Sequence, residues 1–217
     1  GPILSTLNID KLLNTTEKKF IEKLQPVYDA ISKTRKKLDK EKSLIAFVGS
    51  PWTLIIYMLG LKRNKFFLDK QLLEKKKIEI NLILQKLNFF LHIHIDNQIK
   101  AGADVVQIFD SWSGLIPTND LHEYCYNPNL SLVSNCRKKG IPVICFPKGL
   151  GKNYLEFIKY VKPDCISLDY DLDPNWILEN SDAMCYQGGM DPKILLLEEE
   201  KIYQEAEKYL KLFKNKA

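Results

Sequence analysis

The segment Ala101 to Pro117, AGADVVQIFDSWSGLIP, sets one uninterrupted apolar run directly before a polar cluster. Asp104 to Phe109 is predicted to form a strand that is buried on both faces. Asp110, Ser111 and Trp112 follow it and can hydrogen-bond to a ligand or stack on it. Ligands of α/β proteins bind at the carboxyl ends of parallel strands, so the segment predicts an α/β fold with a site at that end. The alternative is a strand that ends in a capped turn.

The segment Leu44 to Gly60, LIAFVGSPWTLIIYMLG, has the same layout. Its apolar strand ends at Gly49, Ser50 suits the N-cap position, and Pro51 suits the first position of an apolar helix. Parallel strands end at a common edge of their sheet. We therefore expect the polar groups of this segment at the same end as the first polar cluster: Ser50, Trp52, Thr53 and Tyr57.

Strand and helix patterns alternate along the chain, which predicts a parallel sheet with right-handed crossovers. Strands are expected at 44–48, 104–109, 142–146, 164–168 and 183–187. Helices are expected at 16–37, 51–60, 70–100 with a break near Asn88, 120–139, 152–161, 174–180 and 192–214, and residues 1–9 are expected to be irregular. An open five-stranded sheet is possible, but it would leave two apolar edge strands unpaired.

These two segments, followed in order by IPVICFPKG, DCISLDYDLD and AMCYQGGMDP, resemble the uroporphyrinogen decarboxylase family. Members of that family remove acetate carboxyls from a tetrapyrrole without a cofactor. The resemblance runs from Gly1 to the end of the chain and implies a (β/α)8 barrel, with residues 1–217 forming one domain of it. It also implies two further strands before Gly1 and one after Ala217. We therefore expect an incomplete barrel with about five parallel strands.

The resemblance assigns three substrate-binding residues. Tyr57 in SPWTLIIYM matches a tyrosine that contacts substrate and steadies a central aspartate. Ser111 in FDSWSG matches a Ser or Thr that hydrogen-bonds a carboxylate arm, and Phe47 in IAFVGSP matches an apolar wall of the cleft. The alternatives are a core tyrosine, a turn cap and an ordinary core phenylalanine.

No catalytic residue is assigned, because the central Asp, the Arg and the His of the family lie in segments that this sequence does not match. The resemblance implies conversion of uroporphyrinogen III to coproporphyrinogen III by four decarboxylations. It also implies a homodimer for the full-length protein. No cofactor is expected, since the protonated pyrrole itself serves as the electron sink. The 217-residue chain alone is expected to have little activity and to aggregate.

Other polar residues at the strand ends are weaker candidates. Asp110 could replace the missing acid, but neighbouring residues of a strand point to opposite sides, so Asp110 and Ser111 are not expected to face one ligand. Lys148, Asp169 and Asp171 also follow strands. For these three, loop capping or a solvated rim is favoured over ligand binding.

Metal and disulfide sites are not indicated. His92 and His94 form a weak metal pair, but the helical pattern around them separates their rings by about 200°. The five cysteines include no C-x-x-C pair, and we assign neither zinc nor a disulfide. The odd number of cysteines fits a reducing compartment, and a cytoplasmic location is expected.

The charge pattern argues against nucleic acid as a partner. The net charge is +5, but only three of the 32 basic residues are Arg, the residue that recognises phosphates and bases in a bidentate manner. Neither a membrane span nor a secretory signal is evident. Two alternative functions remain: a corrinoid or thiol methyltransferase on a related barrel, and a non-catalytic fragment.

Overall fold

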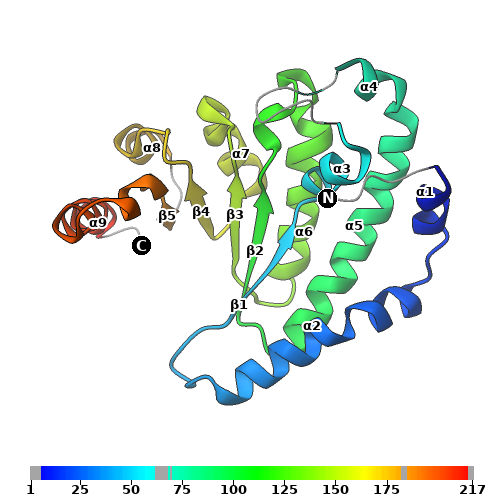
Figure 1. The fold of residues 1–217 in the computed structure, drawn as a ribbon, viewed down its shortest axis with the longest axis horizontal. Coiled ribbons are helices and arrows are strands. Elements are labelled where there is room, and N and C mark those ends of the chain that lie inside the picture. Colours follow the sequence, from blue (N-terminus) through cyan, green and yellow to red (C-terminus); the bar gives the residue numbers. More distant parts are fainter. Residues whose placement is uncertain (1–5, 62–67, 69, 182–184, 215–217) are drawn as a thin grey trace.

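A computed structural model describes residues 6–61, 68, 70–181 and 185–214 of the chain. Its centre is one sheet of five parallel strands in the order β1-β2-β3-β4-β5 (Figure 1). The predicted α/β class and the parallel sheet are confirmed. The strands are β1 (Ile45–Gly49), β2 (Val105–Asp110), β3 (Val143–Pro147), β4 (Cys165–Leu168) and β5 (Tyr186–Gly188).

Helices connect the strands and cover one face of the sheet (Figure 1). The α-helices are α1 (Thr6–Leu13), α2 (Glu17–Lys37), α3 (Pro51–Leu59), α4 (Lys70–Lys75), α5 (Lys77–Lys100), α6 (Asn127–Arg137), α7 (Tyr154–Val161), α8 (Pro174–Asn180) and α9 (Glu199–Phe213). Short 3-10 helices lie at η1 (Ser113–Leu115), η2 (Thr118–Asp120), η4 (Gly151–Asn153) and η5 (Pro192–Leu196), and η3 (His122–Tyr126) is a π-helix.

The predicted helix break near Asn88 is wrong. The break lies at Lys76 instead, between α4 and α5, and α5 runs unbroken through Asn88. Its buried residues recur along the whole helix, so packing against the sheet and α2 holds it straight through the polar position. The amide of Asn88 donates to Ser131 Oγ of α6 at 3.2 Å, which keeps this polar side chain inside the helix layer.

Three other expectations about helices also differ from the structure. A helix, α1, occupies residues 6–13, where irregular chain was expected. Helix α7 begins after η4 at Tyr154, two residues later than the expected start at 152, because residues 151–153 form a 3-10 turn. The last predicted helix divides into η5 and α9, while Asp191 caps η5 by accepting from Lys193 N. The predicted strand residues 183 and 184 lie outside the described residues.

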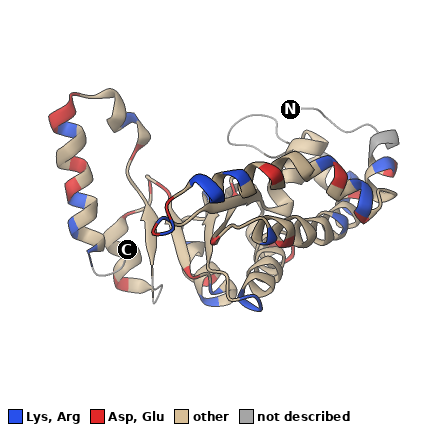
Figure 2. Cartoon of the chain, turned by 90° about the horizontal axis from the view of Figure 1, so that it is seen from below, with Lys and Arg blue, Asp and Glu red and all other residues tan. Residues whose placement is uncertain are grey.

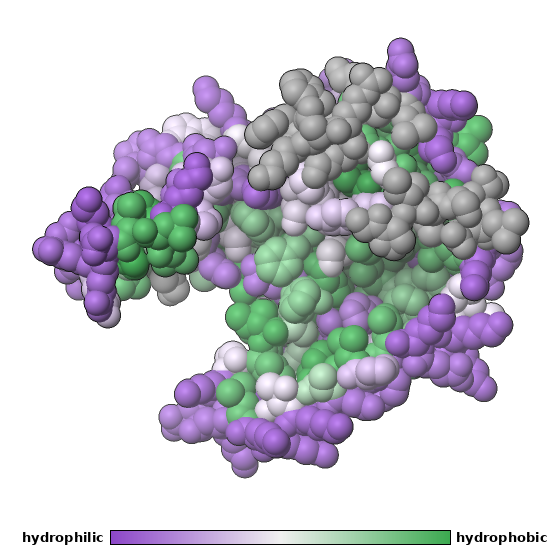
Figure 3. Space-filling model, in the orientation of Figure 1, coloured by the Kyte–Doolittle hydropathy of each residue, from purple (hydrophilic) through white to green (hydrophobic). Residues whose placement is uncertain are grey.

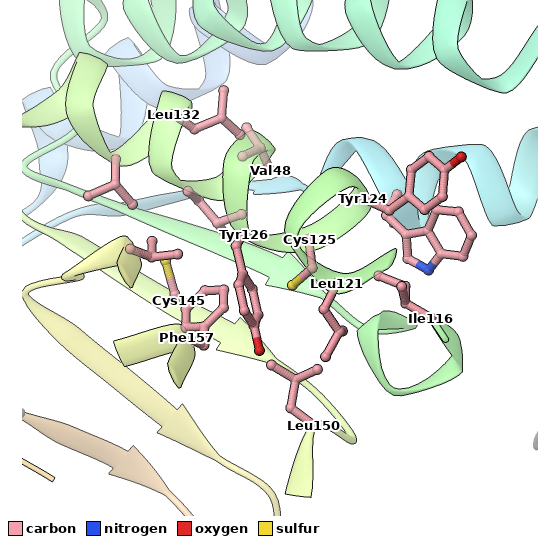
Figure 4. Close-up of a cluster of buried hydrophobic side chains, with 14 of the residues drawn as sticks. Val48, Ile116, Leu121, Tyr124, Cys125, Tyr126, Leu132, Cys145, Leu150 and Phe157 are labelled. Atoms are coloured by element: carbon pink, nitrogen blue, oxygen red, sulfur yellow. The ribbon is translucent and has the colours of Figure 1, made fainter. Parts of the chain in front are cut away.

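The main core lies between the sheet and the helices. Figure 4 shows part of it, where side chains from strands β1 and β3 meet those of η3, α6 and α7. Aromatic rings add directed contacts, such as the stacked pair Trp52 and Tyr124 with centroids 5.1 Å apart. Fully buried members of this core include Trp52, Ile80, Val106, Ile108, Tyr126, Leu132, Cys145, Phe157 and Ile166.

The opposite face of the sheet is open. Figure 3 shows apolar side chains gathered in a central hollow of the molecule on this face. Along β1, the buried residues Ala46 and Val48 alternate with Ile45 and Phe47, which are 46% and 65% exposed. Within the described part of the chain, the side of β1 that faces away from the core is thus left uncovered by helices. Along β2, the strand expected to be buried on both faces, Val106, Gln107 and Ile108 are buried, whereas Val105 and Phe109 are half-buried.

The C-terminal helix α9 carries both signs of charge along its length (Figure 2). It is held at its C-terminal end by Phe213, which stacks on Tyr186 of β5, and by Tyr209, whose hydroxyl donates to Gly189 O at 2.8 Å. None of the helices in the described part of the chain combines the length and apolarity needed to cross a lipid bilayer.

Candidate active site

The loop after β2 is fastened to α3 at the carboxyl end of the sheet. As predicted, Ser50 caps α3, since its hydroxyl accepts from Thr53 N at 3.2 Å. Trp52, the second residue of the helix, donates through Nε1 to Trp112 O at 3.0 Å. The ring of Tyr57 meets the Trp112 ring edge-on, with centroids 6.0 Å apart. Helix α3 thus presents the Tyr57 side chain beside the residue that follows Ser111.

A second set of hydrogen bonds joins the loops after β2 and β3. Gly114 N donates to Lys148 O at 2.9 Å, and Ser113 Oγ lies 2.9 Å from that same oxygen and from Asp110 O. The two loops approach so closely that only glycine fits at position 114. These bonds fix the backbone that carries Ser111 relative to the backbone that carries Lys148.

Asp169 links the loop after β3 to the loop after β4. Its Oδ2 accepts from Gly149 N at 2.5 Å and from the Tyr154 hydroxyl at 3.1 Å. Burial raises the pKa of Asp169, and the two hydrogen bonds oppose this shift. Burial also raises the pKa of Tyr154, assisted by the adjacent Asp169 charge. The capping role expected for Asp169 is present, because its carboxylate closes the loop after β3.

These three loops and α3 enclose a cavity of about 550 Å³. It brings together Tyr57 and Ser111, two of the three residues predicted to bind substrate. The cavity is therefore a pocket with aromatic surface, hydroxyl groups and charges of both signs. Its lining is Tyr57, Ser111, Trp112, Gly114, Leu115, Lys148, Gly149, Asp169, Tyr170 and Asp171.

The third predicted residue, Phe47, lies elsewhere. It stands on the open face of the sheet and is not part of the lining of this cavity. Its ring meets Phe109 edge-on with centroids 5.8 Å apart, and Phe109 meets Phe146 in the same way at 6.4 Å. The three rings form a row across β1, β2 and β3. A substrate role for Phe47 stays a prediction.

Asp110 points away from the pocket. Its carboxylate accepts from Thr53 Oγ1 at 3.0 Å and from Asn129 Nδ2 at 3.1 Å, and it is 1% exposed. Complete burial raises its pKa, and hydrogen bonds from neighbouring side chains oppose the shift. Asp110 thus joins β2, α3 and α6 inside the helix layer, and it does not share a ligand site with Ser111, as expected from the strand geometry.

The two histidines of α5 contact different helices. His92 Nε2 lies 3.2 Å from Ser131 O of α6, whereas His94 Nδ1 lies 3.1 Å from the hydroxyl of Tyr28 in α2. Their interpretation as ordinary helix residues is confirmed. Within the part of the chain that the structure describes, no three His, Cys, Asp or Glu side chains converge as a metal-ion site requires.

Comparison with known proteins decides the family. The model of the family described as uroporphyrinogen decarboxylase (URO-D) matches residues 1–217. The chain belongs to the uroporphyrinogen decarboxylase family. Uroporphyrinogen decarboxylases are carboxy-lyases built on a TIM barrel, which agrees with the five parallel strands and the unclosed sheet found here.

Similar proteins include several uroporphyrinogen decarboxylases. The one from Orientia tsutsugamushi (strain Ikeda) is 41% identical over 85% of this chain and 55% of its own length. Those from Rickettsia bellii and Neorickettsia sennetsu are each 34% identical over 100% of this chain and over 64% and 66% of their own lengths. The chain thus spans 55% to 66% of these uroporphyrinogen decarboxylases, which fits the expectation of an incomplete barrel.

Some residues that shape the pocket were not predicted. The pocket walls are held in place by contacts between the loops, which involve Ser113, Gly114 and Tyr154. The pattern S-x-S-G after β2 was a usable signal for a loop that is closed by a hydroxyl and approached closely by another backbone. The role of Tyr154 could not be predicted from the sequence pattern, because only the fold brings its partner Asp169 close to it.

Proposed function

We propose that the chain forms the substrate-binding wall of a uroporphyrinogen decarboxylase. This enzyme converts uroporphyrinogen III to coproporphyrinogen III by removing four acetate carboxyls. The observation that carries the proposal is the shared pocket of Tyr57 and Ser111, at the carboxyl end of the sheet. Active sites of TIM barrels lie at this end, and both residues stand in the motifs that match the family.

The pocket suits a tetrapyrrole with acidic arms. Trp112 and Tyr57 present aromatic surface against which a macrocycle can pack, and their edge-on contact holds both rings in place. The hydroxyls of Ser111 and Tyr57 can donate to carboxylate oxygens, and such charge-assisted hydrogen bonds are stronger than neutral ones. Orienting one arm in this way holds the acetate carboxyl in the position from which carbon dioxide leaves.

In the decarboxylation step, the substrate itself stabilises the developing negative charge. A protonated pyrrole accepts the electron pair that remains when carbon dioxide departs, so the protein supplies orientation and a dry surface rather than an electron sink. For Tyr57 and Ser111 we propose binding and orientation of substrate, and no transfer of protons. For Phe47 we propose the role of an apolar wall of the substrate cleft.

The test is turnover of uroporphyrinogen III by the native-length protein. Products are oxidised to porphyrins and separated by their number of carboxyl groups. Appearance of the seven-, six-, five- and four-carboxyl porphyrins supports the proposal. A well-folded native-length protein that binds no uroporphyrin and yields none of these products overturns it.

Location and assembly belong to the same proposal. We propose a cytoplasmic homodimer that acts on a small molecule rather than on nucleic acid. Cell fractionation tests the location, and light scattering after size-exclusion chromatography of the native-length protein tests the assembly. A membrane-bound pool or a monomer at micromolar concentration contradicts the respective part.

A further inference from the structure

Lys148 has a fixed backbone at the edge of the pocket. Its N–H donates to Asp110 O at 3.1 Å, and its carbonyl oxygen accepts from Gly114 N at 2.9 Å. Ser113 Oγ reaches the same carbonyl oxygen at 2.9 Å. The next residue, Gly149, is held by Asp169. The position of the Lys148 backbone is thus set by groups from the end of β2, from the loop after β2 and from the loop after β4.

The side chain itself is exposed and lines the pocket. Among the described residues, no ion pair includes the Lys148 ammonium. The Lys148 charge acts on the Asp169 carboxylate without a salt bridge, and Asp169 Oδ2 already accepts from Gly149 and Tyr154. A fixed backbone that carries an exposed ammonium with no salt bridge among the described residues is the arrangement of a group that can meet an anion from outside.

We infer that Lys148 binds a carboxylate arm of the ligand in this pocket. This inference rests on the proposed function and adds a cation to the hydroxyls of Tyr57 and Ser111. A lysine ammonium is a point charge on a flexible stem, so it can follow arms of different length, whereas a guanidinium requires a fixed bidentate geometry. Acetate and propionate arms differ by one methylene, and one lysine can therefore serve both.

Asp171 allows the proposed charge interaction of Lys148 to be checked within the same pocket. It lines the same pocket, is exposed and carries the opposite charge. If Lys148 attracts a carboxylate arm, Asp171 must repel it. Neutralising the two residues one at a time must then change the affinity for an anionic ligand in opposite directions.

The experiment measures binding of uroporphyrin I, an oxidised octacarboxylate that does not react, to the native-length protein at low ionic strength. Lys148→Met is expected to raise the Kd about two- to fivefold, the range for one exposed ion pair. Lys148→Arg keeps the charge and is expected to weaken binding less than Lys148→Met does, and Asp171→Asn is expected to strengthen binding. The matched control is Lys152→Met, which removes the same charge from an exposed residue of η4 outside the pocket lining.

The outcomes separate this inference from the proposed function. If the unmodified protein does not bind uroporphyrin, the proposed function fails. If it binds and Lys148→Met behaves like Lys152→Met, or if Lys148→Arg is as weak as Lys148→Met, the inference about Lys148 is overturned while the proposed function stands. Loss of the effect of Lys148→Met at high salt supports a direct charge interaction.

Discussion

Gly114 and Gly149 place two loops in direct main-chain contact. A Cβ atom built on Gly114 would lie 2.6 Å from the carbonyl oxygen and 2.7 Å from the Cα of Gly149. Gly149 has a φ of +84°, which lets it turn its backbone toward this contact. The contact holds the loop with Ser111 and Trp112 against the loop with Lys148, so the shape of the pocket depends on two residues that have no side chains.

Gly114→Ala is expected to separate the loops. The backbone of Gly149 cannot yield as a side chain would, and we expect a loss of about 1–3 kcal/mol of stability in urea unfolding. Uroporphyrin binding should weaken as well. Gly140→Ala is the control, since that glycine also has positive φ but nothing lies within 4 Å of an added Cβ. It should cost about 1–2 kcal/mol through backbone strain and leave binding unchanged. Equal binding in both variants contradicts the role of the contact.

Tyr57→Phe and Ser111→Ala are expected to lower turnover of the native-length protein. Each removes one hydroxyl that donates to a carboxylate, and we expect kcat/KM to fall about tenfold or the products to shift toward partly decarboxylated porphyrins. Separation of the products by carboxyl number measures both effects. Unchanged kinetics in both variants would mean that the two residues do not contact substrate.

Asp169→Ala and Asp169→Asn are expected to differ. Alanine leaves the buried Tyr154 hydroxyl and Gly149 N–H without their acceptor, at a cost of about 1–3 kcal/mol. The amide oxygen of asparagine can accept from both donors, so this variant should retain most of the stability. Urea unfolding compares them. Tyr154→Phe should add little destabilisation to Asp169→Ala, because the two residues share one hydrogen bond.

Asp110 makes stability depend on pH. Burial raises its folded-state pKa above the ordinary value of about 3.9. The folded state therefore holds the proton more tightly than the unfolded chain does. The resulting stability is fully present below the ordinary pKa and is lost as the pH rises through the folded-state pKa.

The free energy of unfolding, compared between the unmodified protein and Asp110→Asn, measures this effect. The unmodified protein should lose stability relative to the variant as the pH rises through that interval, with a constant difference above it. A difference that moves the other way would show that hydrogen bonds outweigh burial.

Phe47→Ala tests the apolar wall. Because the side chain is 65% exposed, its removal should cost less than about 1 kcal/mol of stability. Uroporphyrin binding should nevertheless weaken. Ile78→Ala, at a residue of α5 that is 82% exposed, is the control and should change neither quantity. Binding that is equal in the two variants removes Phe47 from the proposed site.

The sequence alone predicted the elements that arise from short-range patterns. The strand-to-helix layout around Ser50 and Pro51 depends on a cap and on apolar periodicity, both local properties, and the structure has it. The same holds for the separation of Asp110 from Ser111, since alternation along a strand needs no tertiary information. The prediction of a helix break near Asn88 failed for the complementary reason: α5 is held through this position by packing on α2 and by the bond from Asn88 to Ser131, which is 43 positions away in the sequence.

The motifs placed Tyr57 and Ser111 at one end of the sheet, yet their common pocket required the fold. The walls of that pocket are joined by contacts between residues far apart in sequence: Trp52 with Trp112, Gly114 with Gly149, and Asp169 with Tyr154. No local pattern encodes such pairs, because each partner is an ordinary residue in its own segment. Residue type and spacing therefore determined which strands and helices form, whereas the packing of three loops decided which side chains face one ligand.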